Sequence, residues 1–169
     1  MAELAARERL QPSLLDRLSD DEPDNSTESR ERRVLSLRTL REGVLRDLAW
    51  LLNTTNLLSV LEHDNLPHVG NSVLNYGIPV MSGAAVSSLN VGKLERGIRQ
   101  AIWDFEPRLI KNTVIVKARM SVVEKNMLTF DIEADMWAQP YPERLYLKTD
   151  LDLERGAVIL SEMNGRSIK

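Results

Sequence analysis

The spacing of apolar residues along this chain changes once, from a period near 3.6 to a period of 2, close to Pro107. Before that point, leucines and isoleucines recur at threes and fours, the spacing that gives a helix one apolar face. After it, apolar and polar residues alternate, as in strands that bury one face. Helices followed by strands predict an α+β domain, in which N-terminal helices pack on one face of a C-terminal antiparallel sheet of three to four strands.

Three helices are expected in the first part of this domain. Residues 36–52 carry the longest apolar stripe, and the serine that begins this segment is suited to cap a helix. A shorter helix is expected over 67–76, with Gly77 as a left-handed C-cap. A third helix is expected over 90–104, and Pro107 ends it because the residue before a proline is pushed out of the helical region.

Strands are expected over 114–119, 128–136 and 145–151, and residues 157–160 could add a fourth short strand. The polar segments between them have hairpin length and composition. Because the alternation is regular, we expect one face of the sheet to be covered by the helices and the other to face water.

The N-terminal region contains a short apolar motif followed by a polar stretch. Leu14, Leu15 and Leu18, within residues 12–18, form a one-turn apolar patch on a short expected helix. Residues 19–33 offer nothing to bury and predict a flexible linker. Two interpretations stay open: the motif docks on a partner, or it is a terminal helix that packs on its own domain.

The chain is thus divided into residues 1–33, a docking helix with its linker, and residues 34–169, the α+β domain. Its net charge of −3 gives no global attraction for nucleic acid, and the absence of cysteine excludes disulfides and thiolate metal sites. The N-terminus is too charged for a signal peptide, and no apolar run approaches the roughly 20 residues that span a bilayer. We therefore expect a cytoplasmic protein.

Residue patterns typical of enzymes are sparse. The sequence has no phosphate-binding loop or nucleophile elbow, and the two histidines, His63 and His68, lack the spacing of metal ligands. No catalytic residue, metal or cofactor is expected. The alternative is a peptidoglycan hydrolase with Glu106 as general acid and Asp104 or Asp131 as its partner, which requires two carboxyl groups about 5–10 Å apart.

Glu106, Pro107 and Arg108 stand between the last expected helix and the first strand. Proline stiffens this corner, so the flanking acid and base project in fixed directions. In one interpretation both side chains are exposed and contribute less than about 1 kcal/mol each. In the other they are a rigid charged fork that binds a partner protein, a role that suits the planar guanidinium of arginine.

Four stretches together resemble the TssE family of type VI secretion baseplate subunits, which is similar to the wedge protein of contractile phage baseplates, called lysozyme-like in older naming. The resemblance covers nearly the whole chain. The stretches are Pro-Ser-Leu-Leu-Asp-Arg-Leu at 12–18, the segment 36–54, Ser-Val-Leu-Asn-Tyr-Gly-Ile-Pro at 72–79 and Ile-Arg-Gln-Ala-Ile-Trp-Asp-Phe-Glu-Pro-Arg-Leu at 98–109.

The resemblance implies a structural role without catalysis. Such proteins join the baseplate wedge beside TssF, TssG and TssK, at the cytosolic face of the inner membrane, and nucleate a contractile sheath of TssB and TssC. The edge of the expected sheet suits this role, since an edge can accept a strand from another protein. An adaptor of another phage-derived contractile particle is the remaining alternative.

The resemblance also implies which residues contact partners. The family's Glu-Pro-Arg motif corresponds to Glu106, Pro107 and Arg108, and in the family this motif contacts the core bundle of the wedge. Residues 12–18 correspond to the family's N-terminal motif, which we expect to dock on a wedge partner through Leu14, Leu15 and Leu18.

Overall fold

The computed structural model of the 169-residue chain describes part of it in detail. The expected linker over 19–33, Pro67 and the hairpin near 124–126 lie outside the described residues. Within the described ranges, no helix is long and apolar enough to cross a bilayer. The described residues are 13–18, 36–60, 68–79, 90–119, 127–138, 141–163 and 167–168.

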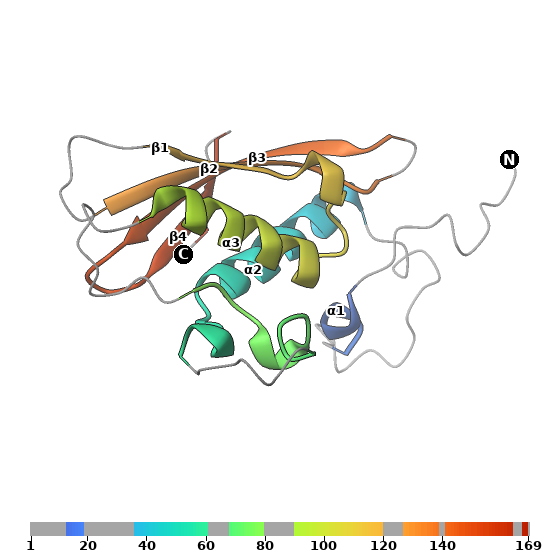
Figure 1. The fold of residues 1–169 in the computed structure, drawn as a ribbon. Helices are drawn as coiled ribbons and strands as arrows, with labels where there is room; N and C mark the ends of the chain where they lie inside the picture. The colour runs from blue at the N-terminus through green and yellow to red at the C-terminus, as the bar shows by residue number, and fades with distance from the viewer. Residues whose placement is uncertain are drawn as a thin grey trace, which may run out of the picture.

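The domain has two layers, a sheet and a pair of helices on one of its faces (Figure 1). Helices α2 (Leu37–Leu52) and α3 (Val91–Phe105) form the helical layer, and the short helix α1 (Leu14–Leu18) lies on the side away from the sheet. The five strands are paired antiparallel in the order β1-β2-β3-β4-β5. They are β1 (Ile115–Arg119), β2 (Met127–Met136), β3 (Glu143–Asp152), β4 (Val158–Glu162) and β5 (Ser167–Ile168).

This arrangement confirms the α+β fold and the order of helices before strands. The two-residue strand β5 extends the expected sheet of three to four strands. The alternating residues of β2 and β3 meet in register, for example Ile132 opposite Leu147, and both are buried against the helices. Thr129 lies on the polar face of β2 by its position, yet it is buried. Its hydroxyl donates a hydrogen bond to the Asp150 carboxylate at 2.7 Å.

The two long helices begin and end where the sequence predicts. Ser36 caps α2, with its hydroxyl accepting from the Thr39 amide at 3.1 Å, and Asn90 caps α3 in the same way. At the other end of α3, Glu106 has left the helical region, with φ −122° and ψ 80°, as expected for a residue before proline. The apolar stripes of both helices form the core with the inner face of the sheet.

The helix expected over 67–76 is wrong in its described part, which contains a turn and the single-turn 3₁₀ helix η3 (Val73–Asn75). The two apolar residues of η3, Val73 and Leu74, are both exposed, so no buried face stabilises a longer helix here. Gly77 has φ +122° and is no helix cap. A Cβ at Gly77 would lie 2.3 Å from the carbonyl oxygen of Thr54, so this glycine permits close backbone approach.

Candidate functional site

The corner between α3 and β1 is fixed by its own backbone. The Arg108 carbonyl accepts a hydrogen bond from the Trp137 amide at 2.8 Å, and the Ile110 amide donates to the Asp135 carbonyl at 2.9 Å. Both bonds join the corner to β2 and its end. The side chains of Glu106 and Arg108 are therefore held in fixed positions, as the sequence predicts.

These two side chains bind each other. Arg108 Nε donates to Glu106 Oε1 at 2.7 Å, and Arg108 Nη2 donates to Glu106 Oε2 at 2.5 Å, a bidentate pair. Only 3% of the Glu106 side chain is exposed, against 18% for Arg108. The interpretation of both as exposed surface charges is thus wrong. Partner binding by Glu106, Pro107 and Arg108 stays a prediction.

The pair continues into a chain of alternating charges on α2. Arg108 Nη2 also contacts Asp47 Oδ2 at 2.6 Å, and the other oxygen of Asp47 contacts Arg46 at 2.8 Å. Arg46 Nη1 in turn contacts Asp16 Oδ1 of α1 at 2.6 Å. We call these five residues the charged corner: Asp16, Arg46, Asp47, Glu106 and Arg108.

The ion pairs of the charged corner shift the pKa values of Arg108 and Asp16. Burial lowers the pKa of Arg108, but hydrogen bonds and negative charge from Glu106 and Asp47 outweigh it and raise that pKa above its ordinary value. Burial raises the pKa of Asp16, but hydrogen bonds from Arg46 and Ser13 outweigh it and hold that pKa below its ordinary value. Both groups are therefore charged at neutral pH.

A third motif of the chain lies against the charged corner. Tyr76 packs edge-on to Phe105 with ring centroids 5.2 Å apart. Burial, followed by the negative charges of Asp47 and Glu106, raises the pKa of the Tyr76 phenol. Residues from all four stretches that carry the family resemblance thus gather at one place, although they are far apart in the sequence.

Helix α1 is held by its polar side and exposes its apolar side. Ser13 accepts a hydrogen bond from the Asp16 amide and donates one to its carboxylate at 2.6 Å. The exposed fractions of Leu14, Leu15 and Leu18 are 71%, 45% and 75%. The acidic side of this motif packs on its own domain through Asp16, whereas Leu14 and Leu18 are mostly exposed. Docking of the motif on a partner stays a prediction.

Gly43 of α2 makes room for this arrangement. A Cβ at Gly43 would lie 3.4 Å from Asp16 Oδ2 and 3.7 Å from Arg108 Nη1, so α1 and the corner meet over this glycine. Arg108 Nη1 is buried, and no hydrogen-bond acceptor for it lies among the described residues. Arg46 Nη2 of the charged corner is likewise buried without a hydrogen-bond acceptor among the described residues, although it lies within ion-pair distance of Asp47.

The carboxylates proposed for a hydrolase are each bound to another side chain of this domain. Both oxygens of Glu106 accept from Arg108, Asp104 accepts from Gln100 at 3.0 Å, and Asp131 pairs with Arg119 at 2.6 Å. In the described part of the chain, no group of three or more metal-ligating side chains is placed to hold a metal ion.

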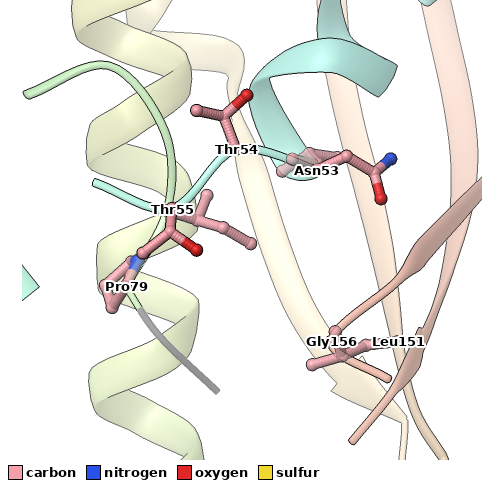
Figure 2. A pocket seen from close by; sticks show the side chains of 8 residues that line it. Asn53, Thr54, Thr55, Pro79, Leu151 and Gly156 are labelled. Carbon is pink, nitrogen blue, oxygen red and sulfur yellow. The ribbon is translucent and has the colours of Figure 1, made fainter. Parts of the chain in front are cut away.

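A small pocket lies at the other end of α2 and shares no residue with the charged corner (Figure 2). Asn53, Thr54 and Thr55 line it together with Pro79, which lies near Thr55 in Figure 2, and with Leu151 and Gly156 on the other side of the view. No titratable side chain lines this pocket, so it offers no acid–base chemistry.

Sequence comparison decides the family. Residues 38–141 match the family model described as baseplate wedge protein gp25, which is more than half of the chain. The chain belongs to this family. Its match includes Arg46, Asp47, Tyr76 and the Glu106–Arg108 pair, whereas α1 lies outside it. No curated protein and no solved structure matched the chain in the other two comparisons.

Membership identifies a structural protein of the phage baseplate wedge type. Sequence reasoning singled out Glu106, Arg108 and the leucines of α1, whose partner binding stays a prediction, and it did not single out Asp16, Arg46 and Asp47, which the structure joins to Arg108. The available signal was an Arg-Asp pair that stands outside the leucine stripe of α2, combined with an aspartate inside the short N-terminal motif.

Proposed function

We propose that this chain is the TssE-type baseplate subunit of a type VI secretion system, which joins the wedge and nucleates sheath assembly. The observation that carries the proposal is the gathering of four separate motifs at the charged corner. A fold alone needs no such convergence, since the apolar core already holds α2, α3 and the sheet together.

The proposed wedge contact has two parts. The first is the exposed face of Leu14 and Leu18, more than two thirds of each being accessible. An exposed aliphatic pair on a helix fits a hydrophobic groove of a partner. The second is the Glu106-Pro107-Arg108 corner, where Pro107 is exposed and the Arg108 side chain is 18% exposed, so that a partner would contact the accessible part of this corner.

The charged corner links these two parts. Asp16 fixes α1 on Arg46, and Asp47 joins Arg46 to Arg108. We infer that the corner presets the position of α1, so that less conformational freedom is lost when the partner binds. The partners we propose are the wedge proteins TssF, TssG and TssK, at the cytosolic face of the inner membrane, and the sheath subunits TssB and TssC.

Co-purification with TssF and TssG tests the wedge role. We expect Leu14→Ala/Leu18→Ala to lose the wedge proteins while its thermal unfolding stays unchanged, because both side chains are exposed. Val60→Ala is the matched control, since Val60 is 68% exposed and lies outside the four motifs. Retention of TssF and TssG by the leucine variant at the wild-type level would contradict the α1 contact.

No catalytic role is part of this proposal. A general acid must face its substrate, and both oxygens of Glu106 accept hydrogen bonds from Arg108 in a side chain that is only 3% exposed. Clearing of purified cell walls by the wild-type protein, abolished in Glu106→Gln, would establish the hydrolase instead.

A further inference from the structure

Trp50 exposes a large aromatic ring on the face of α2 that points away from the core. Gly43, Arg46 and Trp50 are three and four residues apart, so they share one face of the helix. Leu48, which is fully buried in the core, lies on the opposite face. The exposed fraction of Trp50 is 50%, so about half of this side chain is left outside the packing of the domain.

The Trp50 ring is held in place by the charged corner. Arg46 Cζ lies 5.0 Å from the centroid of the ring, a cation–π contact. The guanidinium is itself fixed, since its Nη1 donates to Asp16 at 2.6 Å and its Nε donates to Asp47 at 2.9 Å. A ring that is stacked on a fixed plane loses little conformational freedom when a partner covers it.

Arg46 also places α1 beside Trp50. The guanidinium that stacks on the Trp50 ring is the same one that binds Asp16 of α1. Leu14 and Leu18 of this short helix are 71% and 75% exposed. One arginine therefore brings two exposed apolar groups, which are far apart in the sequence, to the same part of the surface.

The charge of Arg46 is already neutralised within the domain. Its guanidinium lies between Asp16 and Asp47, with N–O distances of 2.6 and 2.8 Å. An acidic partner would gain little here, because it would compete with two carboxylates that are already in place. The indole N–H of Trp50 is a donor, and such groups usually bond to an acceptor once they are buried. The surface therefore fits an uncharged apolar segment that offers an acceptor, such as a backbone carbonyl.

Tyr146 shows the same kind of stacking on the other side of the domain. Arg144 Cζ lies 5.7 Å from the Tyr146 ring, and the exposed fraction of Tyr146 is 42%, close to that of Trp50. Its neighbours in β3, Leu145 and Leu147, are buried in the core, so Tyr146 points to the outer face of the sheet. A half-exposed ring under an arginine thus occurs both beside α1 and far from it.

We propose that Trp50 forms one docking surface with Leu14 and Leu18, that this surface binds an uncharged apolar segment of a wedge protein, and that Arg46 holds its two parts together. This inference rests on the proposed wedge role and adds a residue of α2 to that contact. Trp50 lies within the residues that match the family model, 38–141, whereas α1 lies outside them. Tryptophan is also among the residues that most often dominate the affinity of an interface.

Affinity for a purified TssF–TssG complex tests this surface. We expect Trp50→Ala to weaken binding by about tenfold or more, as for other large aromatic anchors. Tyr146→Ala is the matched control, because it removes a similarly exposed, arginine-stacked ring from the other side of the domain, and we expect it to bind like the wild type. Wild-type affinity in Trp50→Ala, or equal losses in both variants, would overturn the Trp50 contact and leave the wedge role intact. Absence of binding by the wild-type chain would overturn both.

Footprinting of the wild-type chain tests the same contact without any substitution that could affect folding. Hydroxyl-radical labelling of each aromatic side chain is measured by mass spectrometry with and without the TssF–TssG complex. We expect the complex to protect Trp50 and to leave Tyr146 labelled as before. Equal labelling of Trp50 in the free and the bound chain would overturn the proposal.

Discussion

The charged corner and the outer face of the sheet both consist of acids paired with arginines, yet the two regions differ in burial. At the corner, Glu106 is 3% and Arg108 18% exposed. On the sheet, Arg119 pairs with Asp131 across β1 and β2, and the arginine side chain is 64% exposed. Asp131 itself is 19% exposed, so the two pairs differ mainly in the exposure of the arginine and in the near-complete burial of Glu106.

The difference indicates separate roles. A solvated pair gains little, since water and salt screen both charges. A buried pair tolerates no loss of a partner, because the remaining charge is left without solvation. The outer face of the sheet thus carries charge pairs whose arginines are exposed, whereas the corner specifies one arrangement of α1, α2 and the end of α3.

Of the variants that test this difference, Arg108→Ala should have the largest effect on the free energy of unfolding. It leaves the buried carboxylate of Glu106 without its bidentate partner, and we expect a loss of about 3–5 kcal/mol in the free energy of unfolding. Urea denaturation at pH 7 measures it. Arg108→Ala/Glu106→Gln should recover part of the loss because the uncompensated charge is removed, and a double variant no better than the single one would contradict this cause.

Arg108→Lys keeps the positive charge but removes the planar guanidinium that binds Glu106 through two nitrogens. One ammonium cannot satisfy both oxygens of Glu106 together with Asp47, so we expect a loss of about 1–3 kcal/mol, smaller than for alanine. The same denaturation series measures it. A lysine variant as stable as the wild type would show that charge alone suffices at the corner.

Acid should release α1 before it unfolds the domain. The pKa of Asp16 is held below its unfolded value of 3.8, so its stabilising contribution is fully present above that pH and is lost as pH falls through the lower, folded pKa. We expect this contribution to be about 1 kcal/mol or less. An NMR titration of the α1 amides from pH 6 to pH 2 should show undocking in wild type, and no such step in Asp16→Asn, where α1 is already loosened.

Arg119→Ala should have the smallest effect. The Arg119 side chain is mostly exposed, so its ion pair with Asp131 is screened by water, and we expect a change in unfolding free energy below about 0.5 kcal/mol. This variant is the matched control for Arg108→Ala, since each removes one arginine bound to an acid. A loss as large as that of Arg108→Ala would mean that burial does not separate the two regions.

Much of the fold follows from local patterns. The leucine stripe of α2, its serine cap and the effect of Pro107 on α3 act over a few residues, so the sequence is sufficient to predict them. The prediction of a helix over 67–76 was wrong because the apolar residues Val73 and Leu74 are exposed and bury no face of a helix. Strand β5 was missed, although Asn164-Gly165 before it is a strong hairpin signal in the sequence.

The site was predictable only in part, for a physical reason. Glu106 and Arg108 are neighbours in sequence, and a rigid corner between them can be recognised from Pro107. The contact of Arg108 with Asp47 joins residues 61 positions apart, and that of Arg46 with Asp16 joins residues 30 apart. Such contacts depend on how α1, α2 and α3 pack, which periodicity does not specify.

A double-mutant cycle on wedge binding tests the central claim most directly, that the charged corner positions α1 for its partner. The affinity for a TssF–TssG complex is measured for wild type, Asp16→Asn, Leu14→Ala/Leu18→Ala and the combined variant. We predict that Asp16→Asn weakens binding in the wild-type background and adds almost nothing once the leucines are removed, since its effect passes through them. Strictly additive losses, or no loss in Asp16→Asn, would contradict the account.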